Sequence, residues 1–143
     1  MSPDTSNPVR RALFADLVFN EEEQPAKVVT IGNVPHYAVP DGDFLRHVEA
    51  EYVDRQIVKA IQERVRSMRD IVTEGVIHML GEEDLFTRPS IEHAIEHMDR
   101  ILEPGAVDVD ELRAALWMTG FRATVDVHGD LVHLEMPGFD GEQ

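Results

Sequence analysis

Residues 49–80 are the part of the sequence that most constrains the fold, because they contain no proline and repeat apolar residues at a helical spacing. This period places the apolar side chains on one side of an α-helix and the charged side chains opposite. We therefore predict a long amphipathic helix over residues 49–80, in which Gly75 is the weakest point. The apolar positions are Val53, Ile57, Ala60, Ile61, Val65, Met68, Ile71, Val72, Val76 and Met79.

The predicted helix is long for the size of the protein. It would extend about 45 Å at about 1.5 Å per residue. The 143-residue chain is expected to form one domain that is narrower than this. Either the helix breaks, or another subunit covers the part of its apolar face that projects beyond the domain. The second outcome predicts a homodimer.

Three short segments before the helix have the composition of β-strands. Residues 27–31 are rich in β-branched side chains. Gly32 and Asn33 then supply residues that accept positive φ angles, as a two-residue hairpin turn requires. Residues 34–39 return antiparallel, and residues 44–48 form a third strand after a second turn. The pattern predicts an N-terminal β-meander that leads directly into the helix.

Two shorter helices and a hairpin are predicted after the long helix. The helices cover residues 91–103 and 109–119, and the side chain of Asp108 is placed to cap the start of the second one. Residues 123–127 and 131–136 are strand-like segments separated by a turn, so they are predicted to pair as a β-hairpin.

The predicted fold class is α+β, with a small antiparallel sheet, one long central helix and two shorter helices. The sheet combines the N-terminal β-meander with the C-terminal hairpin, because an isolated two-stranded hairpin is marginal in water. The predicted domain covers residues 10–137. Residues 1–9 are predicted to be a disordered N-terminal tail, and residues 138–143 a frayed C-terminal tail.

The composition excludes several kinds of chemistry. The chain has no cysteine, which rules out disulfides, thiolate metal ligands and cysteine nucleophiles. Its net charge is −15, and residues 70–143 hold 4 basic and 17 acidic residues, so no nucleic-acid partner is expected. No apolar run is long enough to span a bilayer, and the N-terminus does not resemble a signal peptide. We therefore expect a cytoplasmic protein without membrane contact.

Two of the seven histidines are the candidate metal ligands. His93 and His97 are four residues apart, so they share a helix face and can both reach one divalent metal ion. The segment lacks the general base of a His-Glu-x-x-His motif, and a third ligand such as His78 or Glu74 would be needed. No catalytic or cofactor-binding residue is predicted.

The methionines at helical spacing are assigned to the interior. Met68, Met79, Met98 and Met118 have the spacing of side chains that fill gaps in a core. Trp117 is expected either in the core or at an interface between proteins.

The absence of a catalytic motif leads to a non-enzymatic hypothesis. We predict a protein-interaction or structural domain that self-associates as a homodimer through the helix at residues 49–80. The alternative is a metal-binding module or metal-dependent hydrolase that uses the surface histidines. A second alternative is a winged-helix-like regulator, because two helices followed by a hairpin resemble half of such a domain, although the acidic charge argues against it.

Overall fold

The computed structural model describes residues 11–81 and 86–137, and it shows the predicted α+β class of fold. The predicted tails at residues 1–9 and 138–143 lie outside the described residues. None of the helices in the described part of the chain combines the length and the apolar character needed to cross a membrane.

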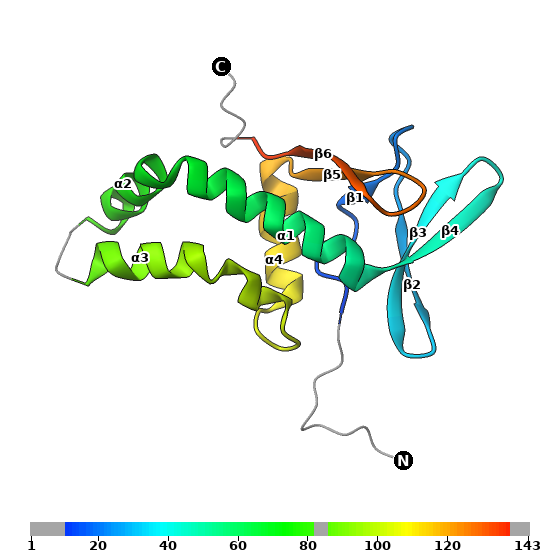
Figure 1. Ribbon diagram of the computed structural model, residues 1–143, viewed down its shortest axis with the longest axis horizontal. Helices are drawn as coiled ribbons and strands as arrows, with labels where there is room; N and C mark the ends of the chain where they lie inside the picture. Colours follow the sequence, from blue (N-terminus) through cyan, green and yellow to red (C-terminus); the bar gives the residue numbers. More distant parts are fainter. Residues whose placement is uncertain (1–10, 82–85, 138–143) are drawn as a thin grey trace, which may run out of the picture.

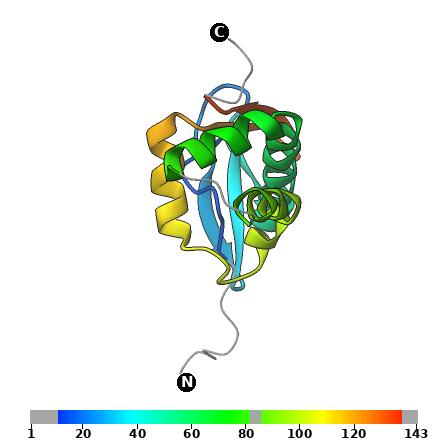
Figure 2. The same cartoon turned by 90° about the vertical axis from the view of Figure 1, so that its left-hand side faces the viewer.

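The elements are arranged along helix α1 (Ala50–Ser67), which crosses the middle of the molecule (Figure 1). A three-stranded sheet lies at one end of α1. Helices α2 (Arg69–Leu80) and α3 (Thr87–Glu96) lie at the other end and form an arm of two helices. Helix α4 (Val109–Thr119) lies on the opposite side of the fold from α1 and α3 (Figure 2).

The predicted β-meander is confirmed. Strands β2 (Lys27–Ile31), β3 (Val34–Asp41) and β4 (Phe44–Glu49) form an antiparallel sheet in that order. Tyr37 and Val39 of the central strand point inward and are fully buried, whereas every residue of β2 is exposed. The core therefore reaches the middle of the meander and leaves its outer strand uncovered.

The C-terminal hairpin is also confirmed, but it belongs to a separate sheet. Strand β5 (Arg122–Val125) pairs antiparallel with β6 (Leu131–Glu135), and β1 (Val18–Phe19) lies parallel to β5. The prediction of one antiparallel sheet shared with the meander is therefore wrong. Strand β1 supplies the third strand that the hairpin needs for stability, so the hairpin forms a sheet without the meander. An isolated antiparallel bridge pairs Phe19 of β1 with Pro25, two residues before β2.

The long helix breaks at Met68, between α1 and α2, and not at Gly75. The hydroxyl of Ser67 donates a hydrogen bond of 2.8 Å to the carbonyl oxygen of Arg64. In a regular α-helix the N–H of Met68 would use that acceptor. It donates instead to the carbonyl oxygen of Val65 at 3.1 Å, which is the tighter spacing of a 3₁₀ turn. The predicted single rod is therefore two helices.

The two predicted shorter helices are present, and one has different bounds. The segment predicted as a helix at residues 91–103 is α3 followed by a short 3₁₀ helix, η1 (Met98–Leu102). Helix α4 begins as predicted, because the carboxylate of Asp108 accepts hydrogen bonds of 3.1 and 3.2 Å from N–H groups of its first turn. Gly120 ends the same helix with a φ angle of 85°.

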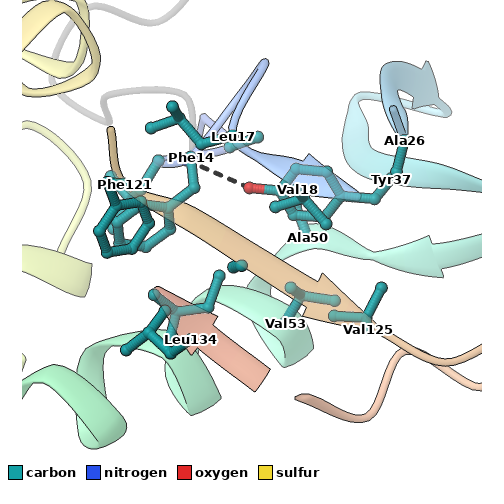
Figure 3. Close-up of a cluster of buried hydrophobic side chains, with 14 of the residues drawn as sticks. Phe14, Leu17, Val18, Ala26, Tyr37, Ala50, Val53, Phe121, Val125 and Leu134 are labelled. Atoms are coloured by element: carbon teal, nitrogen blue, oxygen red, sulfur yellow. Dashed lines mark hydrogen bonds between the residues drawn. The ribbon is translucent and has the colours of Figure 1, made fainter. Parts of the chain in front are cut away.

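The core lies between α1 and the two sheets (Figure 3). The ring of Phe14 stacks on that of Phe121 with centroids 5.7 Å apart. Figure 3 also shows the hydroxyl of Tyr37 directed at the backbone of Phe14. The segment before β1 is thus a central part of the core. Fully buried side chains include Phe14, Leu17, Val18, Tyr37, Val39, Val53, Ile57 and Val125.

Candidate functional site

The predicted metal ligands His93 and His97 lie side by side at the end of α3. Their rings stack with centroids 4.0 Å apart, and Nδ1 of His97 lies 2.9 Å from the carbonyl oxygen of His93. In the described part of the chain, no group of three or more His, Asp or Glu side chains is placed to hold a metal ion. Glu74, a candidate third ligand, is paired with Arg88 at 2.7 Å. The histidine pair therefore lacks a third ligand among the described residues, and a zinc site needs at least three protein ligands.

A second polar cluster, formed by Tyr37 and Asp54, lies inside the core. The hydroxyl of Tyr37 donates to Oδ1 of Asp54 at 2.6 Å, and the N–H of Leu13 donates to Oδ2 at 2.9 Å. The N–H of Phe14 donates to the tyrosine oxygen at 3.1 Å. Burial, followed by the negative charge of Asp54, raises the pKa of Tyr37 well above its usual value. Both side chains are buried, so the cluster ties the N-terminal segment to α1 and β3 and meets no substrate.

Helix α2 presents an apolar surface to solvent, which we name the α2 face and define as Ile71, Gly75, Met79 and Leu80. The exposed fractions are 68% for Ile71, 84% for Met79 and 62% for Leu80. A Cβ atom added at Gly75 would meet no other atom within 4 Å. The opposite side of the helix buries Ile77. The prediction that Met79 lies in the core is therefore wrong.

A groove between α4 and β1 is a second apolar surface, which we name the α4 groove. Its larger part has a volume of about 500 Å³. A continuation of about 250 Å³ shares Phe19 and Trp117 with it and extends to Arg122. Trp117 is 61% exposed and Met118 is 85% exposed, so the assignment of Met118 to the core is wrong. The larger part is lined by Asp16, Phe19, Pro25, Arg113, Ala114, Trp117 and Met118.

Helix α4 takes the position in sequence that a recognition helix would have in a winged-helix domain. Its one basic residue is Arg113, which lies 3.3 Å from Asp110 and 3.9 Å from Asp16. A helix that reads DNA needs several cationic side chains to offset the charge of phosphates. The geometry of α4 therefore adds no support to the nucleic-acid alternative.

Comparison with known proteins gives no assignment for the chain. No protein-family model, no curated protein and no solved structure matches it.

Proposed function

We propose that this protein is a non-enzymatic interaction domain that forms a homodimer through helix α2. The observation that carries the proposal is the exposure of the α2 face on an arm at one end of the molecule (Figure 1). The proposal narrows the predicted contact from residues 49–80 to their second half. The reason is that the apolar side of α1, including Val53, Ile57 and Val58, is buried by its own chain.

The line formed by Ile71, Gly75 and Met79 suits a symmetric contact. The three residues follow one another at intervals of four, so they lie along one stripe of the helix. In an antiparallel pair centred on Gly75, Ile71 of one copy faces Met79 of the other at both ends. The missing side chain at Gly75 lets the two backbones approach closely. The stripe carries no charge, so the contact avoids the repulsion expected for a chain with a net charge of −15.

The expected dimer is weak, because the contact is small. Helix α2 has 12 residues and is about 18 Å long at about 1.5 Å per residue. Burial of a side chain such as isoleucine or methionine contributes about 1.5–3 kcal/mol. Association itself costs about 4–15 kcal/mol in lost freedom. Ile71 and Met79 from both copies together contribute about 6–12 kcal/mol, so we expect a dissociation constant that is micromolar at the tightest.

Met79→Glu is expected to abolish the dimer and leave the monomer folded. The side chain is 84% exposed, so the monomer accepts a glutamate, whereas the dimer would bury two carboxylates against apolar side chains. Sedimentation velocity over a range of micromolar concentrations should show a monomer–dimer equilibrium for the wild type and only monomer for the variant. Met118→Glu is the matched control, because Met118 is 85% exposed on α4. A wild type that stays monomeric, or a Met79→Glu variant that associates normally, would contradict the proposal.

Gly75→Ala is expected to make the monomer more stable and the dimer weaker. The added methyl group meets no atom within 4 Å in the monomer, and alanine favours a helix over glycine by about 0.5–1 kcal/mol. At concentrations where no dimer forms, urea unfolding should show a gain of this size. The dissociation constant of the dimer should rise, because two methyl groups now meet at the centre of the contact. Equal dimer affinity in the two proteins would place the contact elsewhere.

A further inference from the structure

The α4 groove is a place where large apolar side chains meet solvent at a hollow in the surface. Trp117 and Met118 of α4 line its larger part together with Phe19 and Pro25. Both α4 side chains are largely exposed. Concave apolar surfaces of this kind are typical of binding sites. The groove therefore suits a partner that brings at least one apolar side chain.

The two arginines of the groove are already paired, and the carboxylates that pair with them are the more exposed groups. Arg113 lies 3.9 Å from Asp16. Arg122 lies 3.9 Å from Glu23 and 4.0 Å from Glu135. The side chains of both arginines are at most 37% exposed, whereas those of the three carboxylates are 51–82% exposed. A molecule that approaches the groove therefore meets negative charge first.

These three carboxylates, which we name the acidic rim, keep their oxygens available as acceptors. Distances of 3.9–4.0 Å exceed the range of a hydrogen bond. Ammonium and guanidinium groups bind carboxylates through charge-assisted hydrogen bonds. The exposed indole of Trp117 also favours a cation over its face. The rim and the indole together favour a basic partner, and the rim repels an acidic one.

We propose that the α4 groove binds a segment of a partner protein in which an apolar anchor lies between basic residues. The anchor fills the space beside Trp117 and Met118. One basic side chain lies near Asp16 in the larger part of the groove, and another lies near Glu23 and Glu135 at the continuation. The net charge of −15 attracts such a segment from a distance.

Trp117 is the only tryptophan in the chain, so its fluorescence reports on the groove. The probe is the peptide acetyl-Arg-Leu-Phe-Leu-Arg-amide, which has no tryptophan of its own. Titration should shift the emission of Trp117 to shorter wavelength with saturation, and added salt should weaken the binding. The charge-reversed peptide acetyl-Glu-Leu-Phe-Leu-Glu-amide is the control and should not bind. Equal binding of the two peptides, or no saturable change with the basic one, would overturn the proposal.

Neutral variants of the acidic rim test whether charge at the groove, rather than the charge of the whole chain, selects the peptide. Loss of the three rim carboxylates should weaken binding about tenfold, at the contribution usual for exposed ion pairs. Loss of three carboxylates elsewhere should change binding by less than about twofold, and an equal loss in both would overturn the proposal. The rim variant is Asp16→Asn, Glu23→Gln and Glu135→Gln, and its matched control is Asp43→Asn, Glu92→Gln and Asp99→Asn.

Two further variants locate the bound peptide and separate it from the proposed dimer. Ala114 is exposed and lines the groove, so Ala114→Lys should abolish binding through bulk and like charge while α4 stays folded. Met79→Glu removes the proposed dimer contact on α2 and should leave peptide binding unchanged. Normal binding to Ala114→Lys, or loss of binding in Met79→Glu, would place the peptide outside the α4 groove.

Discussion

Gly129→Ala is expected to lower the free energy of unfolding by about 2–5 kcal/mol. Gly129 has a φ angle of 84°, a conformation in which an L side chain costs about 1–2 kcal/mol. A Cβ atom there would lie 2.3 Å from Cγ1 of Val48 on β4, and such overpacking costs about 1–3 kcal/mol. The turn is also fixed in place. The N–H of Gly129 donates to the carbonyl of Asp126 at 3.0 Å, and the carbonyl of Gly129 accepts from Nε2 of Gln56 at 2.8 Å.

Urea unfolding followed by far-UV circular dichroism measures this loss, and Gly42→Ala is the matched control. Gly42 has a φ angle of 62°, but an added Cβ atom would meet nothing within 4 Å, so only the conformational cost of about 1–2 kcal/mol is expected. Val48→Ala in the Gly129→Ala background should recover part of the difference. If Gly129→Ala and Gly42→Ala lose equal stability, the hairpin turn does not pack tightly on the meander.

The sequence predicts the elements that short-range chemistry defines. The pair Gly32 and Asn33 sets the first turn of the meander, and both residues have positive φ angles. Asp108 and Gly120 set the two ends of α4 through a side-chain cap and a left-handed residue. The α+β class follows from these local elements, whereas the division into two sheets depends on pairing between distant strands.

The side of α2 that faces solvent does not follow from the period of the sequence. If α2 continued α1 without a break, Met79 would lie on the buried stripe. The chain leaves the regular α-helix at Met68, next to the hydrogen bond from Ser67 to Arg64. As a result α2 buries Thr73 and Ile77 and exposes Met79. The break at Met68 thus sets which residues of α2 are exposed and available for the proposed dimer.

The α4 groove also depends on a pairing of strands that no sequence pattern predicts. Phe19 belongs to a strand of two residues, which has no period, and it reaches the groove because that strand lies parallel to β5. The sequence of α4 does indicate which side of this helix faces the groove. Leu112 and Leu116 lie on one side of the helix and are half-buried, and the helical period places Met118 away from them. The exposure of Met118 is therefore predictable, but the opposite wall of the groove is not.

Asp54→Ala is expected to lower the free energy of unfolding by about 3–5 kcal/mol. The carboxylate of Asp54 accepts hydrogen bonds from the hydroxyl of Tyr37 and from the N–H of Leu13, and Asp54 is 3% exposed. Alanine would leave two buried donors without this acceptor, at about 1–3 kcal/mol each, and would add a cavity. Asp54→Asn is the matched variant, because its amide oxygen still accepts from Leu13 and should make the loss smaller. Equal losses in the two variants would show that the hydrogen bonds contribute little.

The same cluster sets an alkaline limit to stability, which Tyr37→Phe can isolate. The pKa of Tyr37 is raised in the folded protein, first by burial and then by the charge of Asp54. A raised pKa means that the fold binds the phenolic proton more tightly than the unfolded chain does. The stabilisation is therefore complete below the unfolded-state pKa of about 10 and is lost as the pH rises above it, by up to about 1.4 kcal/mol per pH unit.

Urea unfolding of the wild type and Tyr37→Phe at several pH values measures this loss, because groups common to both proteins cancel in the difference. The stability advantage of the wild type over Tyr37→Phe should be constant up to about pH 9 and should shrink steadily above about pH 10. A difference that stays constant through the alkaline range would mean that the hydroxyl ionises equally well in the folded and unfolded chains. The phenol would then be open to water, and Asp54 would not hold the N-terminal segment to α1 through a buried network.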